Sequence, residues 1–282
     1  MTERSILITG CSSGIGLCAA HTLRERGWRV FATARAEEDV ATLVEAGFEA
    51  LQLDLTCSES IRTAVGEVFK RTGGRLDALF NNGAYGQPGA VEDLSREVLS
   101  EQFETNVFGT HELTCRVIPA MRAQGHGRIV HNSSILGFAT LPFRGAYNSS
   151  KFALEGLADT LRLELRGSGI DLSLIEPGPI VSRFRDNAFA AYERNIDRAN
   201  SAHAHTYRAL ERRLKGEAGK TPFTLPAEAV VAKLLHALES KRPKARYFVT
   251  FPTWLFGCLK RVLPSRAMDW VLWHSTARER QD

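Results

Sequence analysis

The stretch Thr9-Gly10-Cys11-Ser12-Ser13-Gly14-Ile15-Gly16 joins a short apolar run at residues 5–9 to a helical pattern over residues 15–26. Glycines let a backbone turn tightly and approach an anion closely, and the free N–H groups at a helix start favour negative charge. A glycine-rich turn between a strand and a helix therefore predicts a site for the pyrophosphate of a dinucleotide. The GxxxGxG spacing differs from the general GxGxxG pattern, so an ordinary tight turn is the alternative interpretation of these residues taken alone.

Strand and helix patterns alternate outward from this turn through residue 180. Apolar runs typical of strands cover residues 28–34, 50–54, 76–80, 127–131 and 170–175, and helical patterns cover residues 39–45, 58–71, 98–123 and 146–165. Such alternation with short connections predicts an α/β fold, a Rossmann-type doubly wound parallel sheet with helices on both faces. Residues 183–220 break the pattern and are polar, basic and helical in composition. A further helix at 226–239 and a last strand at 246–250 follow.

The composition is that of an ordinary folded protein, with 44% of the 282 residues hydrophobic and 24% charged. The five cysteines are widely spaced without a CxxC pair, which indicates neither a disulfide framework nor a zinc site and favours a reducing, cytoplasmic location. The longest uncharged stretch near the end of the chain, residues 247–259, is shorter than the ~20 residues that span a bilayer. His203 and His205 have no partner at metal-ligand spacing, so no metal is expected.

The net charge of +4 conceals an uneven distribution. Residues 1–182 carry 17 Lys and Arg against 22 Asp and Glu, whereas residues 183–282 carry 19 against 10. This surplus is modest and no nucleic-acid-binding motif accompanies it, so nucleic acid is not an expected partner. The last thirty residues combine basic charge with Trp254, Trp270 and Trp273. Three interpretations stay open for them: packing on the domain, closure of a substrate pocket, or peripheral contact with an anionic membrane.

The end of the second predicted strand bears on the kind of dinucleotide. A carboxylate at this position holds the adenine ribose hydroxyls of NAD, and it would repel a 2′-phosphate. Here the strand contains no acid and Arg35 follows it at once. A guanidinium binds phosphate well, so NADP(H) is the expected cofactor, although an Arg in an exposed loop is the alternative.

A second group of residues has the chemistry of acid–base catalysis. Tyr147 and Lys151 are four residues apart, which places both on one face of a helix, and a nearby ammonium favours tyrosinate. Such a tyrosine is a general acid for a carbonyl and a general base for an alcohol. Ser134 at the end of the fifth strand is suited to bind the substrate oxygen, with Ser133 as its competitor. Asn106 in the helix at 98–123 is suited to hold a water in a proton relay to Lys151.

The combined set resembles the short-chain dehydrogenase/reductase family through about residue 185. The matching features are TGxxxGxG, Asn81-Asn82-Gly83-Ala84, Asn106, Ser134, Tyr147/Lys151 and Pro177-Gly178. Residues 8–17, 141–143, 151–156 and 246–248 are similar to the 17β-hydroxysteroid dehydrogenase type 1 and retinol dehydrogenase branch. Residues 174–180 and 260–264 look closer still to bacterial NADP-dependent aldehyde reductases of that branch.

The resemblance implies a single domain, with residues 1–182 as the cofactor and catalytic core and residues 183–282 as the helical substrate cover and C-terminal extension. It implies a homodimer or homotetramer built on the helices around 98–123 and 147–165. It also assigns roles by position: catalysis to Asn106, Ser134, Tyr147 and Lys151; cofactor binding to Gly10, Ser12, Ser13, Gly14, Ile15, Gly16, Arg35, Asp54, Leu55, Asn82, Gly83, Ala84, Tyr147, Lys151, Pro177, Gly178, Ile180 and Ser182.

One departure from the family pattern concerns cofactor contacts. The family usually reads Asn-Asn-Ala-Gly where this chain has Asn81-Asn82-Gly83-Ala84, which moves the backbone freedom of glycine by one residue.

The substrate end is predicted to be apolar. Leu136, Leu141 and Phe143 lie between Ser134 and Tyr147 in sequence and are expected to form one wall of the substrate site. The expected activity is NADP(H)-dependent reduction of a lipophilic aldehyde or ketone, such as a medium-chain aldehyde or retinal. A hydroxysteroid dehydrogenase, or a protein that senses NADP(H) without turnover, is the alternative.

Overall fold

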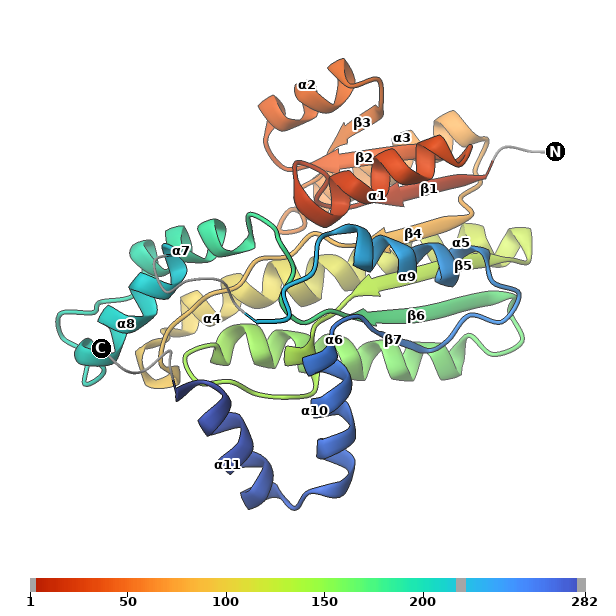
Figure 1. Cartoon of the computed structure of the whole chain (residues 1–282). Helices are drawn as coiled ribbons and strands as arrows, with labels where there is room; N and C mark the ends of the chain where they lie inside the picture. The colour runs from red at the N-terminus through yellow and green to blue at the C-terminus, as the bar shows by residue number, and fades with distance from the viewer. Residues whose placement is uncertain (1–3, 217–221, 278–282) are drawn as a thin grey trace.

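A computed structural model describes residues 4–216 and 222–277, which form one parallel sheet with helices on both faces (Figure 1). The seven strands lie in the order β3-β2-β1-β4-β5-β6-β7, and every pair is parallel. They are β1 (Ser5–Ile8), β2 (Arg29–Ala34), β3 (Glu49–Gln52), β4 (Ala78–Asn81), β5 (Gly127–Asn132), β6 (Ile170–Glu176) and β7 (Arg246–Phe248). The predicted doubly wound α/β fold is confirmed.

The helices before α10 follow the predicted positions, with one exception, and α10 and α11 lie in a part of the chain for which no helix bounds were predicted. They are α1 (Gly14–Glu25), α2 (Glu37–Glu45), α3 (Ser58–Thr72), α4 (Arg96–Phe103), α5 (Thr110–Gln124), α6 (Gly145–Glu164), α7 (Phe184–Asn195), α8 (Ala204–Leu214), α9 (Glu228–Glu239), α10 (Phe251–Val262) and α11 (Ser265–Ser275). Short 3₁₀ turns occur at η1 (Val91–Asp93) and η3 (Ile135–Gly137). The exception is the helix expected over 98–123, because a π-helical turn, η2 (Glu104–Gly109), separates α4 from α5.

Alternating side chains divide the core into two layers. Ile6 and Ile8 of β1 face a cluster built with α1 and α9, whereas Leu7 between them faces a cluster built with α3, α5 and α6. This is the period-two pattern of a strand that is buried on both faces. The sheet order reverses direction between β1 and β4, and ligands of such sheets bind outside the carboxyl ends of the strands at that point.

Two further layers cover the carboxyl ends of the strands. In Figure 1, α7 and α8 lie together beyond these strand ends, where Tyr192 and Tyr207 form their buried core. The helices α10 and α11 form a hairpin whose Met268 and Leu272 pack on Ala139 after η3. None of the described helices is both long and apolar enough to cross a membrane.

Candidate active site

The glycine-rich turn needs its glycines for two steric reasons, backbone angles and close packing. Gly10 and Gly14 have φ angles of 71° and 57°, in the left-handed region that favours glycine. A Cβ on Gly16 would lie 2.1 Å from the carbonyl oxygen of Gly10, so no side chain fits there. Ser13 precedes α1, and its side chain makes no capping hydrogen bond. The N–H groups of the first turn therefore remain available to a phosphate, and this cradle fits a dinucleotide.

The segment after β4 is tied directly to this turn. Asn82 donates from Nδ2 to the carbonyl oxygens of Thr9 and Gly10 at 3.0 and 3.1 Å, and Asn132 of β5 donates to Asn82 Oδ1 at 2.9 Å. The Thr9 hydroxyl accepts from the backbone N–H groups of Asn82 and Gly83 at 2.9 and 2.8 Å. Neither Gly83 nor Ala84 has a positive φ angle. The exchange of Ala and Gly in this segment therefore leaves the backbone unstrained.

The residues expected around the adenosine lie at the ends of β2 and β3. Arg35 directly follows β2 and is exposed. Asp54 accepts hydrogen bonds at Oδ1 from the N–H and hydroxyl of Thr56 at 2.9 and 2.8 Å, which orients its carboxylate toward its own turn. Leu55 is buried, and its carbonyl approaches Gly109 so closely that a Cβ there would lie 1.8 Å away.

The loop after β6 closes over the glycine-rich turn. A Cβ on Gly14 would lie 3.2 Å from Cβ of Ser182, which places these two segments in contact. Pro177 accepts a backbone hydrogen bond from Ile135 at 2.8 Å, and Ile180 forms an isolated parallel bridge with Leu225. The structure thus brings two segments with predicted cofactor-binding residues, the glycine-rich turn and the loop after β6, into contact.

The start of α10 also reaches this loop. A Cβ on Gly178 would lie 2.2 Å from Oγ1 of Thr250 and 3.1 Å from Oγ1 of Thr253. Both threonines are buried, and their hydroxyls are 2.9 Å apart. The sequence gives no signal for this contact, because Thr250 and Thr253 belong to no motif and lie about seventy residues from Gly178.

The catalytic candidates converge from two elements. Tyr147 and Lys151 lie in the first two turns of α6, and Ser134 follows the end of β5. The Ser134 hydroxyl lies near the Tyr147 phenol and favours its ionised form. The Lys151 Nζ lies 5.6 Å from the centre of the Tyr147 ring and donates to the Asn132 carbonyl oxygen at 2.8 Å. The predicted Ser, Tyr and Lys therefore lie together.

Ser133, the competing hydroxyl, is buried beside Glu155. A Cβ on Gly137 would lie within 3.1 Å of both Ser133 Oγ and Glu155 Oε1.

The pKa values of Tyr147 and Lys151 differ from the sequence expectation that the ammonium favours the tyrosinate. Burial raises the pKa of Tyr147 above its ordinary value, and the Ser134 hydroxyl only partly opposes this. Burial also lowers the pKa of Lys151 to about 8, against the attraction of Glu155. Desolvation disfavours both charged forms and outweighs the effect of the ammonium on the phenol. In the protein alone, Tyr147 therefore keeps its proton at neutral pH.

Asn106, the residue predicted to hold a water in a proton relay, lies in the π-helical turn η2. Asn106 is buried, and its Nδ2 donates to the Tyr85 carbonyl oxygen at 2.9 Å and to Ser150 Oγ at 3.0 Å. Its Oδ1 accepts from the Tyr85 N–H at 3.1 Å. Both hydrogens of the amide are thus bound by protein, and only its oxygen can accept a further hydrogen bond from water. The relay role stays a prediction.

The three predicted wall residues separate in the structure. Leu136 is buried in η3, Leu141 packs toward α10 and α11, and Phe143 packs with Tyr207 of α8. Leu141 and Phe143 line a cavity of about 670 Å³ between the start of α6 and α11, whereas Ser134, Leu136 and Tyr147 do not. Phe184 of α7 lies against the phenol instead, with ring centres 5.2 Å apart.

Comparison with known proteins agrees with this geometry. A model of the short chain dehydrogenase family matches residues 4–193. The chain belongs to this family. As an oxidoreductase of the short-chain dehydrogenase/reductase type, it has a site suited to interconvert a carbonyl and an alcohol with a nicotinamide cofactor.

Three relatives place it more closely within the family. The chain is 44% identical over 270 residues to the uncharacterized oxidoreductase YbbO of Escherichia coli (strain K12), covering 96% of this chain and 94% of that protein. It is 35% identical to human 17-beta-hydroxysteroid dehydrogenase type 1, over 89% of this chain and 78% of the relative. It is 31% identical to an NADPH-dependent 3-dehydrocapnine reductase of Ornithobacterium rhinotracheale, over 99% of both chains. These matches confirm the expected branch.

Proposed function

We propose that this protein reduces a lipophilic aldehyde or ketone to the alcohol with NADPH. The observation that carries the proposal is the convergence of Ser134, Tyr147 and Lys151, with the Lys151 Nζ 5.6 Å from the ring of a phenol that keeps its proton. A protonated phenol is the form that a carbonyl reduction requires, because the product oxygen must gain a proton.

Each catalytic residue then has one task. NADPH, held at the glycine-rich turn, would be the source of the hydride that the carbonyl carbon needs. The Ser134 hydroxyl binds the carbonyl oxygen beside Tyr147, which transfers its O–H proton to that oxygen as the C–O double bond becomes single. The Lys151 ammonium stabilises the tyrosinate that this transfer leaves behind, and its hydrogens not bound to Asn132 are placed to bind the ribose.

Arg35 and the NADPH-dependent relative support NADPH over NADH. The guanidinium of Arg35 is exposed directly after β2, where a 2′-phosphate would lie beside the adenine ribose. No carboxylate of β2 would repel it. The relative that covers 99% of both chains is itself NADPH-dependent.

A lipophilic substrate is supported by the walls around the site. Phe184 lies against Tyr147, and the cavity beside the start of α6 has mainly apolar walls formed by Val91, Leu141, Phe143, Phe152, Leu272 and Trp273. Asn148, the residue after Tyr147, also lines this cavity, and we propose that the cavity holds the apolar end of a long substrate.

A carbonyl screen tests the proposal. Decanal, retinal and a keto-steroid are offered with NADPH and with NADH, and consumption of NADPH is followed by its absorbance. We expect turnover with at least one of them, a preference for NADPH, and loss of turnover in Tyr147→Phe with retained NADPH binding. Tyr247→Phe, a phenol of β7 bonded to His236, is the matched control and should keep turnover.

Two outcomes of this screen would replace the proposal. A preference for the keto-steroid would indicate a hydroxysteroid dehydrogenase. Tight NADPH binding without consumption would favour a protein that senses the cofactor.

We also propose a homodimer or homotetramer built on the outer faces of α5 and α6. Phe108 in η2 and Leu157 and Leu163 on α6 are 52%, 43% and 58% exposed, which is unusual for large apolar side chains on regular helices. Sedimentation equilibrium should give an oligomer for the wild type and a smaller species for Leu157→Glu. A monomeric wild type would contradict this proposal.

For the hairpin of α10 and α11 we propose peripheral contact with anionic lipid. Trp254, Trp270 and Trp273 are each more than half exposed, and Arg261 and Arg266 lie exposed nearby in sequence. The pairing of tryptophan with basic charge suits an anionic interface. The five free cysteines support a reducing, cytoplasmic location for such an enzyme. Co-sedimentation with phosphatidylglycerol vesicles, but not with phosphatidylcholine vesicles, is the expected result, and no difference between the two would refute it.

A further inference from the structure

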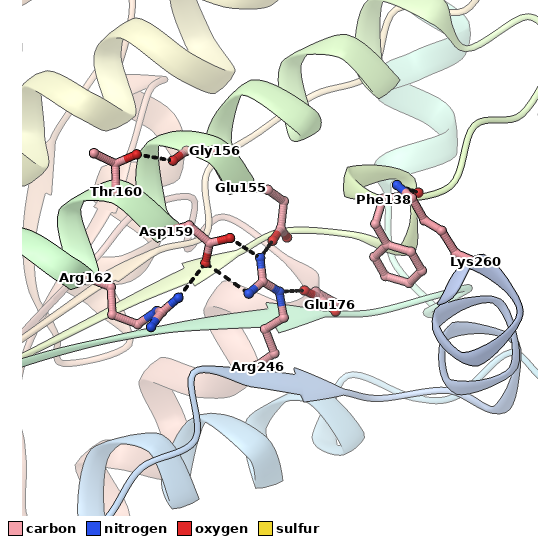
Figure 2. Close-up of polar contacts among 9 residues, drawn as sticks. All are labelled: Phe138, Glu155, Gly156, Asp159, Thr160, Arg162, Glu176, Arg246 and Lys260. Atoms are coloured by element: carbon pink, nitrogen blue, oxygen red, sulfur yellow. Dashed lines mark hydrogen bonds and ion pairs between the residues drawn. The ribbon is translucent and has the colours of Figure 1, made fainter. Parts of the chain in front are cut away.

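Arg246 of β7 extends toward α6 and contacts three carboxyl groups, those of Glu155 and Asp159 on α6 and of Glu176 on β6 (Figure 2). Arg246 donates from Nε to Glu176 Oε1 at 2.9 Å and from Nη2 to Glu155 Oε2 at 2.8 Å. It also donates from both Nη atoms to the two oxygens of Asp159, at 2.9 and 2.8 Å. The side chains of Glu155 and Glu176 are 8% and 0% exposed, whereas that of Asp159 is 40% exposed.

The two buried carboxyl groups carry different charges. Burial and the neighbouring negative charge of Glu155 raise the pKa of Glu176 to about 8, so Glu176 holds a proton at neutral pH. Burial also raises the pKa of Glu155, but the Ser133 hydroxyl and the Arg246 guanidinium oppose that effect. Glu155 is therefore the ionised partner of the pair, and Glu176 is the protonated one.

Glu155 lies on the catalytic face of α6. Tyr147, Lys151 and Glu155 follow one another at intervals of four residues, so they form one row along the helix. The helical rise places Glu155 about 6 Å beyond Lys151 along the axis, and Asp159 about 12 Å beyond it. Glu176 is the last residue of β6 and directly precedes Pro177 of the cofactor loop.

The titratable and charged groups that surround Lys151 leave Glu155 as its nearest anion. Tyr147 keeps its proton, and burial lowers the pKa of His131 on β5 to about 3, so both are neutral. Glu155 is the only charge that opposes the effect of burial on Lys151 among the described residues. Beyond it lie the groups described above: Asp159 on α6, Glu176 on β6 and Arg246 on β7.

We propose that Glu155 is a positioning residue of the catalytic site: its buried carboxylate, clamped by Arg246 and Glu176, keeps the Lys151 ammonium charged from one helical turn away. The clamp also keeps the carboxylate from bonding to Lys151, whose Nζ donates to Asn132 instead. An ammonium has three hydrogens, so this arrangement leaves two for the ribose and the phenol. The charge on Lys151 is a property of the folded chain, and only its use in turnover rests on the proposed function.

Nuclear magnetic resonance titration of the ligand-free protein tests this directly. Lysine is labelled with ¹³C at Cε, and the Lys151 signal is assigned by its absence in Lys151→Arg. We expect Glu155→Gln to lower the titration midpoint of Lys151 by at least about one pH unit, because an isosteric amide removes the charge of the nearest described anion. A midpoint within about 0.3 pH units of the wild type would overturn the proposal.

Two variants serve as matched controls. Asp159→Asn removes another partner of Arg246. The Asp159 side chain is 40% exposed and lies twice as far from Lys151 along the helix as Glu155 does, so we expect less than about a third of the shift in the Lys151 midpoint. Glu176→Gln keeps a neutral donor beside Glu155 and should leave the Lys151 midpoint near that of the wild type. An equal shift in all three variants would show a general loss of packing and would refute a specific role for Glu155. If Glu155→Gln fails to fold, the uncharged variant Glu155→Met takes its place, and an unchanged Lys151 midpoint in that variant refutes the proposal.

Kinetics separate this proposal from the proposed function. In Glu155→Gln the alkaline limb of kcat for carbonyl reduction should move to lower pH together with the Lys151 midpoint. If the midpoint moves but the wild type reduces no carbonyl, the proposed function fails and the electrostatic role stands. If the wild type turns over and both the midpoint and the limb stay in place, the role of Glu155 fails and the proposed function stands.

Discussion

Replacement of Arg35 by Ala should weaken the binding of NADPH and leave that of NADH unchanged. Arg35 is exposed after β2, so its interaction with a 2′-phosphate takes place partly in water. A hydrogen bond to a charged group contributes about 1.5–3 kcal/mol, and exposure favours the lower end of that range. A loss of about 1.5–2 kcal/mol corresponds to an increase of about 10- to 30-fold in the Kd for NADPH.

Titration of NADPH and NADH fluorescence with each variant measures this loss. NADH lacks the 2′-phosphate, so it serves as the internal control, and Arg122→Ala, an exposed arginine in the last turn of α5, is the control for charge removal. The effect on NADPH should shrink in 0.5 M salt, because salt screens an exposed ion pair. Equal weakening of NADH and NADPH would refute the assignment of Arg35 to the 2′-phosphate.

Three other predictions follow from the geometry of the site. Gly16→Ala places a methyl group 2.1 Å from the Gly10 carbonyl oxygen. We therefore expect the free energy of unfolding in urea to fall by about 1–3 kcal/mol and NADPH binding to be lost. Normal NADPH binding in this variant would contradict the assignment of the glycine-rich turn to the cofactor phosphates. Because the pKa of Lys151 is lowered to about 8, its charged form is lost as pH rises through that value, and kcat for reduction should fall between about pH 7 and 9; a profile that stays flat to pH 10 argues against a role for the charge. Asn106→Ala removes three hydrogen bonds to Tyr85 and Ser150, which should cost about 2–4 kcal/mol of unfolding free energy. A variant as stable as the wild type would show that these hydrogen bonds do not stabilise the fold.

Local patterns were sufficient to predict the sheet and to name candidate site residues that the structure brings together. The alternation of apolar runs gave the seven strands, since a strand buried on both faces is continuously apolar. The Gly10–Gly16 turn and the Tyr147–Lys151 pair each depend on spacing within one element, and spacing is visible in the chain. Parallel strands then bring their ends together, so Ser134, Asn82 and Pro177 were expected at the same edge.

Features that depend on side-chain direction between distant segments were not predictable. Leu141 and Phe143 are two residues apart, yet one faces the α10–α11 hairpin and the other faces α8. The contact of Thr250 and Thr253 with Gly178, and the clamp of Arg246 on Glu155, join segments about seventy and ninety residues apart. The π-helical turn at η2 was missed because a single turn of altered winding leaves the apolar pattern of the helix nearly unchanged.

Because of that π-helical turn, we expect the fold to tolerate the deletion of one residue between α4 and α5. Such a turn holds one residue more than an α-helix needs to connect the same two flanking segments. Loss of a single residue within Glu104–Gly109 would let α4 and α5 join as one regular helix, with the outer faces of both segments kept in register. The hydrogen bonds of Asn106 to Tyr85 and Ser150 would be lost in the process. This helix is therefore a place where shortening the chain can preserve the architecture while it removes the part of the helix that faces the active site.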